Sequence, residues 1–483
     1  MPIKAKLRRV RIDYVCSETK KTAFAYNVAM LDFSNKTVHF IGIGGISCNA
    51  LAKFVLDFGG KVSGSDAKIT PICDELRAKG AKIWQGEAPQ NIDADIVVFS
   101  SAIRADNKEL VFAKQSGAKL YERHEFLGEV SRLFGRSVAI AGTHGKTSTT
   151  AMVTHILKKS NLKFLSMIGG ECVDGGNYVN NTYADKMSDL KNCVFVTEAC
   201  EYKRHMLAVK RDIGVVTNVE CDHPDCYKNL DEVQDAFKSF LNGTPIKIAS
   251  EKDISDLYKT PTNSSCFCVV CEQDTIYAKV GDDGARIYQN GTYVARLKLE
   301  DNGEYNYKNA LFALTVAYRL GVRIKDGADM LASYKGVKRR FERGTDIDDT
   351  RVYFDFAHHP QEIKCVLERA RKYGSAIVVF QPHTYSRTKA YLSDFASVLG
   401  GCDYAKYIVI MPTYPARETL SMGVGSDILK DAIFDKFPQK QVYLAKNNQS
   451  TVDFVKSHAN EVDTVLMIGA GDIYDLKATL AKR

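Results

Sequence analysis

The 483-residue sequence contains no apolar run that approaches the roughly 20 residues needed to cross a bilayer. Its basic N-terminus is not followed by the uninterrupted apolar segment of a signal peptide. Its 13 cysteines, an odd number spread over the whole chain, do not follow the spacing of a disulfide framework. These absences argue against a membrane partner and predict a cytoplasmic protein with reduced thiols.

The chain also lacks a strong charge imbalance outside its N-terminus. The formal net charge is +8, and residues 1–21 hold seven Lys and Arg side chains against two acidic ones. Residues 1–36 are therefore predicted to form a basic extension, either a solvated arm or an extra strand. The mildly basic remainder does not require nucleic acid as a partner and suits anionic, phosphorylated substrates. A chain of this length is expected to form two to four domains.

The first block begins with a buried strand at Thr37 that enters a glycine turn, followed by a helix through about Leu56. A second strand, from Lys61 to Ser65, ends in Asp66. This βαβ pattern is typical of nucleotide-binding domains, in which an acidic residue at a similar distance contacts a ribose. Because Ser47 stands where a dinucleotide-binding turn has its third glycine, an oxidoreductase that uses NAD is the less favoured interpretation.

The second block opens with a glycine-rich turn between an apolar strand, Val138 to Ala141, and a helical run from Ala151 to Lys159. Such a turn lets backbone N–H groups approach a triphosphate, while Lys146 contacts the β and γ oxygens and the Thr147 or Ser148 hydroxyl holds Mg²⁺. The loop is a shortened variant, because Ile140 stands where the usual phosphate loop has its first glycine. We expect ATP to bind here.

Two further strands of the second block, near residues 193–196 and 213–216, run into polar clusters. Ligands bind at the carboxyl ends of parallel strands, so both clusters should face the triphosphate. Glu198 and His223 are therefore candidate ligands of Mg²⁺ or Mn²⁺. Alternatively, Asp222 to Pro224 forms only a helix cap and a turn.

The third block contains four apolar strands that each end in a polar loop. The strands are predicted at residues 351–356, 376–380, 407–411 and 465–468. This pattern is typical of a doubly wound α/β sheet with one active edge. The whole chain is thus predicted to be an α/β protein of three domains, each a mostly parallel sheet with helices.

In their order and spacing, these blocks resemble the Mur ligase family of peptidoglycan synthesis over about residues 37–475. The motifs that carry the resemblance are Gly42 to Gly45, Ala141 to Thr147, Thr217 to His223, Arg339 to Glu342, Asp355 with Ala357 to Pro360, Phe380 to Thr388, and Gly469 to Ile473.

This resemblance implies a ligase that uses ATP to join L-alanine to UDP-N-acetylmuramate through an acyl phosphate. It also implies a Rossmann-like UDP-binding domain at residues 37–133, a central ATP-binding domain at residues 134–337 and a Rossmann-like domain for the amino acid at residues 338–483. Closure of these domains would assemble the site, with a hinge expected around Gly344.

The resemblance further assigns roles to individual residues. The sugar nucleotide would contact Gly42, Gly44, Gly45, Ile46, Ser47 and Asp66. ATP would contact Gly142, Thr143, His144, Gly145, Lys146, Thr147, Ser148, Asn306, Asn309, Arg340 and Asp355. The amino acid would contact His358, His383 and Arg387, and the metal would be held by Thr147, Glu198 and His223. Catalysis would depend on Lys146, Glu198, His223, His358 and Arg387.

Some positions depart from the family pattern. The acidic run after Glu198 is thinned by Cys200, Tyr202 and Lys203, and other departures are Glu87, Tyr305 and Phe356. They leave open a related ligase that adds another amino acid or a preformed peptide, and a nucleotide-binding regulator without catalysis. A structural zinc site at the histidines 358, 359 and 383 is not favoured, and the cysteines between residues 266 and 271 are predicted to lie in a buried strand.

Overall fold

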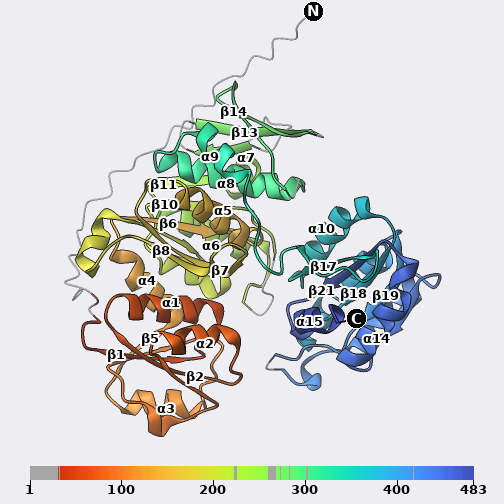
Figure 1. Cartoon of the computed structure of the whole chain (residues 1–483), viewed down its shortest axis with the longest axis horizontal. Helices are drawn as coiled ribbons and strands as arrows, with labels where there is room; N and C mark the ends of the chain where they lie inside the picture. Colours follow the sequence, from red (N-terminus) through yellow and green to blue (C-terminus); the bar gives the residue numbers. More distant parts are fainter. Residues whose placement is uncertain are drawn as a thin grey trace, which may run out of the picture. The chain divides into compact units, whose positions relative to one another are not determined.

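The computed structural model describes residues 31, 33–221, 226–258, 268–271, 274–281, 283–300, 303–416 and 418–482. Residues 32–483 form one unit. This unit contains three β-sheets, built from successive parts of the chain (Figure 1). The predicted three-domain α/β architecture is therefore confirmed, while its domain boundaries stay a prediction. Within the described residues, no helix is both long enough and apolar enough to span a bilayer.

The first sheet has five parallel strands in the order β3-β2-β1-β4-β5. Because the order reverses between β1 and β4, loops from both halves of the sheet open at this point. Its strands are β1 Thr37–Ile41, β2 Lys61–Asp66, β3 Lys82–Gln85, β4 Ile96–Phe99 and β5 Lys119–Glu122, and its helices are α1 Ile46–Asp57, α2 Pro71–Ala78, α3 Lys108–Gln115 and α4 Arg123–Arg132.

The second sheet has ten strands, of which β11-β10-β6-β9-β7 form a parallel centre. Antiparallel strands extend both edges, β12 to β15 on one side and β8 on the other. The strands are β6 Arg136–Ala141, β7 Phe164–Cys172, β8 Gly176–Asn181, β9 Val194–Glu198, β10 Ile213–Val216, β11 Ile246–Ser250, β12 Cys268–Cys271, β13 Asp274–Gly281, β14 Gly284–Gln289 and β15 Thr292–Leu297.

The helices of this second region are α5 Lys146–Lys158, α6 Leu230–Asn242, α7 Glu251–Tyr258, α8 Glu304–Arg319 and α9 Ile324–Leu331. The buried core joins α5 and α8 to the strands on one face of the sheet. The predicted cysteine-rich strand is confirmed for β12, where Val269 and Cys271 are buried. Cys266 and Phe267 lie outside the described residues.

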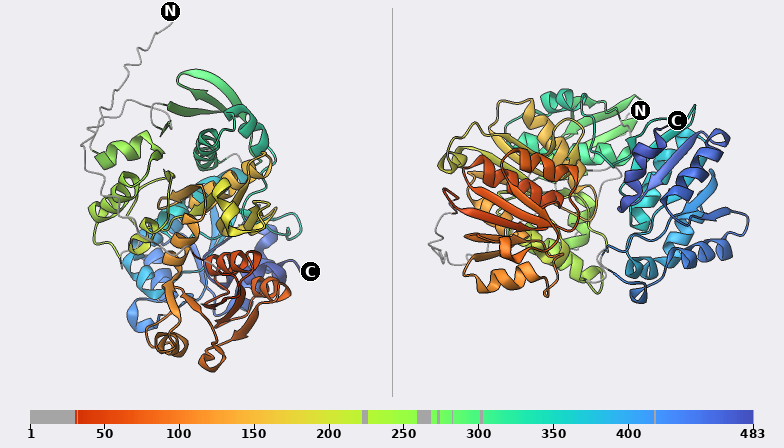
Figure 2. Two further views of the ribbon diagram at one scale, coloured as in Figure 1. Left: turned by 90° about the vertical axis from the view of Figure 1, so that its left-hand side faces the viewer. Right: turned by 60° about the horizontal axis from the view of Figure 1, so that its bottom comes forward.

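The third sheet has the order β16-β17-β21-β18-β19-β20 and is parallel except for β16. Its side chains alternate between two cores, with Tyr353 in one and Val352 and Phe354 in the other, because successive residues of a strand face opposite sides. Helices accordingly cover both faces (Figures 1 and 2). The elements are β16 Glu342–Arg343, β17 Arg351–Asp355, β18 Ala376–Phe380, β19 Ala405–Ile410, β20 Gln441–Leu444, β21 Thr464–Ile468, α10 Pro360–Ala370, α11 Tyr385–Ala390, α12 Leu392–Gly400, α13 Ser426–Lys436, α14 Asn448–His458 and α15 Leu476–Leu480.

The segment from residue 332 to residue 341 connects the second and third sheets. Its backbone partners change abruptly along the chain. The N–H of Lys338 donates to the carbonyl of Glu171 in β7 at 2.8 Å, whereas the carbonyl of the next residue, Arg339, accepts from Phe356 beyond β17 at 2.7 Å. The connection is thus attached to one sheet up to Lys338 and to the other from Arg339 onward.

Candidate active site

The glycine-rich turn lies between β6 and the N-terminus of α5, as predicted. Gly142 and Gly145 have φ of 136° and 83°, a region that residues with a Cβ rarely adopt. A Cβ on Gly142 would also lie 2.0 Å from Thr217 Oγ1, and one on Gly145 would lie 2.5 Å from Asn309 Oδ1. Only glycine therefore allows β10 and α8 to approach the turn this closely. The geometry brings Asn309 of α8 against the predicted phosphate loop.

Lys146 begins α5, and its ammonium group lies inside the turn. Nζ donates to the carbonyl oxygens of Gly142 at 2.6 Å and Thr143 at 3.0 Å, and it forms an ion pair with Glu201 at 3.0 Å. Burial acts to lower the pKa of Lys146, but the charges of Glu201 and Glu198 outweigh it and hold the pKa above its ordinary value. The lysine therefore keeps its positive charge inside the turn.

Thr147 and Glu198 supply two oxygen atoms beside Lys146. Thr147 Oγ1 donates to Glu198 Oε2 at 3.1 Å, and the other carboxylate oxygen accepts the backbone N–H of Gly169. Burial raises the pKa of Glu198, although the Gly169 N–H and the Lys146 charge oppose this shift. A hydroxyl and a carboxylate are ligands of the type that Mg²⁺ prefers. The third predicted metal ligand, His223, lies outside the described residues.

His144 is held by three side chains from outside the turn. Its backbone N–H donates to Asn218 Oδ1 at 2.8 Å, and its ring lies 3.5 Å from Glu220 Oε2 and 3.2 Å from Glu362 Oε1 of α10. Burial acts to lower the pKa of His144, but the contacts with the carboxylates of Glu220 and Glu362 outweigh it and raise the pKa to about 9. The charged ring of His144 thus links the phosphate loop to α10, the first helix of the third sheet.

The first sheet carries a second nucleotide-type turn between β1 and α1. Gly42 has φ of 86°, and the N–H of Gly44 donates to Asp66 Oδ2 at 2.8 Å, so the carboxylate at the end of β2 supports the turn itself. Gly45 caps α1, and Ile46 and Ser47 begin it. The hydroxyl of Ser47 accepts from Arg123 Nη1 at 3.0 Å. All six residues predicted for the sugar nucleotide therefore lie at this turn.

On the third sheet, Asp355 ends β17 with its carboxylate buried. Its two oxygen atoms accept the N–H groups of Phe341 and Ala357, each at 2.8 Å. Burial raises the pKa of Asp355, and the nearby charge of Arg340 opposes this shift. The guanidinium of Arg340 lies 5.3 Å from the centre of the Phe356 ring. Arg340 and Asp355 thus lie near each other at the third sheet, and their predicted contact with ATP stays a prediction.

The residues predicted for the amino acid form one group on the third sheet. The rings of His358 and His383 are 5.7 Å apart. The charge of Arg387 in α11 contributes to the pKa of both. Burial, more than any charge, lowers the pKa of His358 to about 4 and that of His383 to about 3. Both imidazoles are therefore uncharged at neutral pH, beside a permanently cationic guanidinium.

A cavity of about 250 Å³ brings residues of the first two sheets together. Ser47 of the sugar-nucleotide turn, Lys146 of the phosphate loop and Glu198 at the end of β9 all line it. The other lining residues are Ala50, Arg123, His124, Leu127, Met167, Ile168, Gly169, Thr197, Ala199, Cys200, His205 and Val209. A carboxylate carried by a ligand on the first sheet could therefore meet a phosphate held at the second.

Sequence reasoning missed the carboxylates that organise this site. Glu201, Glu220 and Glu362 pair with Lys146 and His144. Glu362 stands three residues after His359, and the capping box that these two form at the start of α10 is a pattern that could have located it. No local pattern in the sequence indicates that Glu362 contacts the phosphate loop. Of the remaining predicted residues, Ser148 is half-buried in α5 and Asn306 lies in the first turn of α8.

A phosphate-binding turn on a parallel sheet, a second nucleotide-type turn on a neighbouring sheet and a third α/β sheet define a nucleotide-dependent enzyme of three α/β domains. The chain belongs to the Mur ligase family. Residues 37–134 match the Mur ligase family catalytic domain, residues 140–317 match the Mur ligase middle domain, and residues 339–471 match the Mur ligase, glutamate ligase domain.

Several known proteins are similar over nearly the whole chain. The UDP-N-acetylmuramate--L-alanine ligase of Clostridium acetobutylicum is 36% identical over 455 residues, which cover 92% of this chain and 96% of that protein. The enzyme of the same name from Caldanaerobacter subterraneus is 37% identical over 457 residues, which cover 91% and 96%.

Solved structures share the fold. The crystal structure of UDP-N-acetylmuramate-alanine ligase MurC from Thermotoga maritima has a TM-score of 0.75 and 26% identity, and the match covers 93% of this chain and 99% of that one. A murein peptide ligase from Psychrobacter arcticus has a TM-score of 0.66 at 21% identity, with 92% and 98% covered, which shows the common fold alone.

Proposed function

We propose that this protein is an ATP-dependent ligase that joins L-alanine to UDP-N-acetylmuramate, forming UDP-N-acetylmuramoyl-L-alanine, ADP and phosphate in the synthesis of peptidoglycan precursors. One observation supports it above all: a single cavity is lined by Ser47 of the sugar-nucleotide turn, by Lys146 of the phosphate loop and by Glu198 at the end of β9. Identities of 36% and 37% to ligases of this name, over more than nine-tenths of the chain, favour the same reaction.

The reaction would proceed in two steps because a carboxylate is a poor electrophile at neutral pH. A carboxylate oxygen of the lactyl group attacks the γ-phosphorus of ATP, and the bond to the β-bridging oxygen breaks, so that ADP leaves. The ammonium group of L-alanine loses one proton to solvent, and the free amine then attacks the carbonyl carbon of the acyl phosphate. The tetrahedral intermediate expels phosphate, which takes the second proton of the nitrogen, and an amide remains. Phosphoryl transfer of this kind depends mainly on positioning and charge neutralisation.

For the first step, the phosphate loop supplies fixed positive charge. Lys146 must exchange the carbonyl oxygens of Gly142 and Thr143 for the phosphate oxygens, and its raised pKa keeps it charged during this exchange. The N-terminus of α5 points its N–H groups toward the same phosphates. Thr147 and Glu198 would hold Mg²⁺, which when bound neutralises charge on the transferring phosphoryl group.

For the second step, the third sheet would position the amino acid. Arg387 can grip the alanine carboxylate with two hydrogen bonds. The imidazoles of His358 and His383 carry no charge at neutral pH, so they do not repel the ammonium group of the incoming amino acid. They can accept hydrogen bonds from that group and orient its nitrogen toward the acyl phosphate.

Phosphate release by the purified protein tests this proposal. We expect phosphate from ATP only when Mg²⁺, UDP-N-acetylmuramate and L-alanine are all present. A panel of single amino acids and a preformed tripeptide distinguishes the alternative, a related ligase that adds a different amino acid or a peptide. Equal turnover with the tripeptide and with L-alanine would favour that alternative, and phosphate release without any sugar nucleotide would contradict both.

A further inference from the structure

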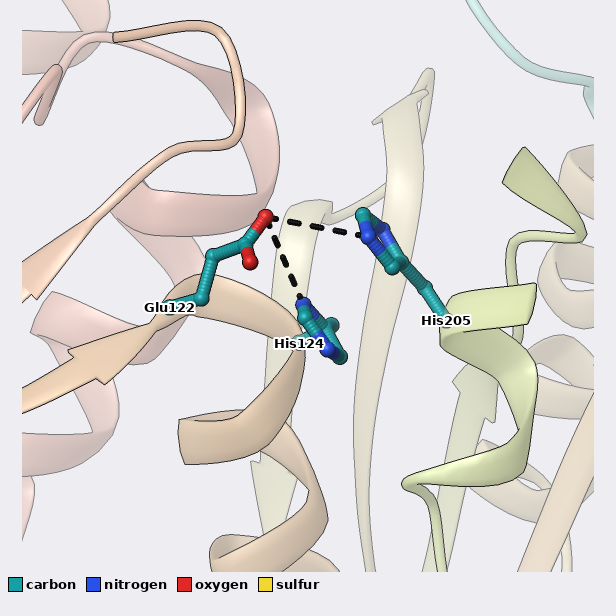
Figure 3. Close-up of side chains that lie close together, drawn as sticks. All are labelled: Glu122, His124 and His205. Atoms are coloured by element: carbon teal, nitrogen blue, oxygen red, sulfur yellow. Dashed lines mark ion pairs between the residues drawn. The ribbon is translucent and has the colours of Figure 1, made fainter. Parts of the chain in front are cut away.

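A group of side chains that could bind a metal ion lies partly in the wall of the cavity, and the reaction described above assigns it no role. Glu122, His124 and His205 each offer one ligand atom, and these atoms all lie within 4.8 Å of one another. Throughout the described part of the chain, no other set of three or more such side chains converges in this way. Figure 3 shows the carboxylate of Glu122 facing both rings, with the rings side by side.

The three residues come from two different parts of the fold. Glu122 ends β5 and His124 lies in the first turn of α4, both on the first sheet. His205 lies in the short 3-10 helix η3, Tyr202–Leu207, which follows β9 of the second sheet. His124 and His205 also line the cavity that contains Lys146. An ion held by all three residues would therefore connect the first sheet to the second beside the proposed active site.

The distances favour an ion over hydrogen bonds. Glu122 Oε1 lies 3.6 Å from His124 Nδ1 and 3.7 Å from His205 Nε2, both too long for a hydrogen bond. A tetrahedral zinc ion with bonds of about 2.0–2.1 Å would separate two ligand atoms by roughly 3.3 Å. The two separations from the carboxylate exceed this value by only a few tenths of an ångström. The ring nitrogens of the two histidines lie within 4.8 Å of each other, so one ring must turn for both to reach a shared ion.

The local environment prepares these side chains as ligands. His124 Nδ1 is buried and makes no hydrogen bond within the described residues. The Glu122 carboxylate accepts the N–H of Glu125 at the start of α4, which fixes its direction toward the rings.

From this arrangement we propose that Glu122, His124 and His205 form a site for Zn²⁺, with a fourth position open to the cavity. Two imidazoles and one carboxylate are a ligand set that zinc accepts, whereas Mg²⁺ prefers oxygen atoms alone. The rings are now stacked at 3.8 Å with an angle of 5° between their planes. Because parallel rings cannot both point a lone pair at one ion, zinc binding should tilt one ring out of the stack.

The experiment measures zinc binding by the full chain with its thiols kept reduced. Zinc is titrated in competition with a chromophoric chelator, for wild type and for the variants His124→Phe, His205→Phe and Glu122→Gln. Phenylalanine keeps the ring packing and removes the nitrogen, and glutamine keeps the cap of α4 and removes the charge. His155→Phe is the matched control, because His155 is also a half-buried ring packed on an aromatic side chain.

We expect each site variant to bind its tightest zinc ion at least tenfold more weakly than wild type, while His155→Phe binds it as wild type does. Zinc should also raise the melting temperature of wild type and of the control more than that of the variants, because it binds only the folded site. Thermal unfolding measured without zinc identifies any variant that fails to fold. If the histidine variants do not fold, the zinc affinity of Glu122→Gln compared with that of wild type tests the proposal.

Crystals grown with zinc provide a second measurement that does not depend on variants. Anomalous scattering at the zinc edge should place an ion between the three side chains, with the two rings no longer parallel. Equal zinc affinity in wild type and in all three site variants would overturn the proposal. So would an anomalous signal found only at cysteines or at other histidines, with the stack unchanged.

Discussion

Single side chains of the phosphate loop are held by partners far away in the sequence. Lys146 and Glu201 are 55 positions apart, and both are largely buried. Neither charge can be removed without leaving the other unpaired inside the protein, and an unpaired buried charge is costly. The pair therefore fixes the ammonium group at the turn, but a variant of either residue will also affect stability.

Lys146→Ala should reduce phosphate release by roughly a hundredfold or more, because it removes the charge that neutralises the transferring phosphoryl group. Lys158→Ala, at the exposed end of the same helix, is the control and should retain turnover. Melting temperatures of both variants show how much of the loss is due to unfolding. Full activity in a folded Lys146→Ala variant would contradict the assigned role of the lysine.

His144 predicts a pH dependence of stability. Its pKa is about 9 in the folded protein, above the ordinary value of 6.5, so its stabilising contribution is fully present below pH 6.5 and is lost as the pH rises through about 9. A shift of this size corresponds to on the order of 3 kcal/mol. The melting temperature of wild type should therefore exceed that of His144→Gln most at pH 6 and least at pH 9.5.

His155 is the control for this measurement, because burial lowers its pKa below the ordinary value. Its neutral form is favoured by folding, so wild type loses stability relative to His155→Gln as the pH falls below about 6.5. The melting temperature of wild type relative to His155→Gln must therefore decrease as the pH falls. Relative to His144→Gln, it must decrease as the pH rises. If both variants showed the same pH trend, the two carboxylates would not be holding an imidazolium at His144.

At the scale of elements, the helix that begins at Lys146 depends on the glycine before it. Gly145 combines a positive φ with close contact to Asn309 of α8. Gly291, in the turn between β14 and β15, has a similar φ of 86°, but no atom lies within 4 Å of the position that a Cβ would take. A substitution at Gly291 therefore tests backbone strain alone, whereas a substitution at Gly145 tests backbone strain together with steric contact.

Gly291→Ala should cost roughly 1–2 kcal/mol, the strain of a positive φ in a residue with a Cβ, and should retain turnover. Gly145→Ala adds the contact with Asn309, so we expect a larger drop in melting temperature and loss of ATP binding. Thermal unfolding and nucleotide titration measure both effects. Equal effects of the two substitutions would mean that Asn309 moves away without cost.

Local patterns explain which elements could be predicted from the sequence. The strand, glycine turn and helix at residues 136–158 are contiguous, so the roles of Lys146 and Thr147 could be inferred from spacing alone. The contact between His144 and Glu362 spans 218 positions and depends on the packing of α10, which no local pattern specifies. Of the antiparallel extension from β12 to β15, only β12 was predicted as a strand, because alternation of strand and helix indicated only the parallel part of the second sheet.

At the scale of the whole molecule, the residues proposed for substrate binding and catalysis are divided among three sheets, so the proposed reaction requires the sheets to be positioned together. The sequence predicted a hinge around Gly344. The structure favours a different position, because the N–H of Gly344 donates to Val352 at 2.8 Å and a Cβ would lie 2.9 Å from the Phe354 ring. Gly344 is thus fixed within the third sheet's first hairpin, and the change of partners occurs between Lys338 and Arg339.

Lys338→Pro tests the new position. Proline removes the N–H that bonds to Glu171 and restricts the backbone at the point where the two attachments meet. We expect turnover to fall several-fold, with much less change in ATP affinity, since the phosphate loop is not altered. Lys338→Ala, which loses only the side-chain ion pair with Glu171, should retain turnover.

Phosphate release at varied ATP concentration, together with direct nucleotide binding, measures both quantities for these two variants and for Gly344→Ala. Gly344→Ala should lower the melting temperature through its contact with Phe354 and should leave the turnover of the folded protein near that of wild type. Glu171 lies in β7, whose neighbour β9 carries Glu198. A loss of ATP affinity as large as the loss of turnover in Lys338→Pro would therefore indicate damage to the metal and phosphate site through these strands, and would argue against a hinge at Lys338.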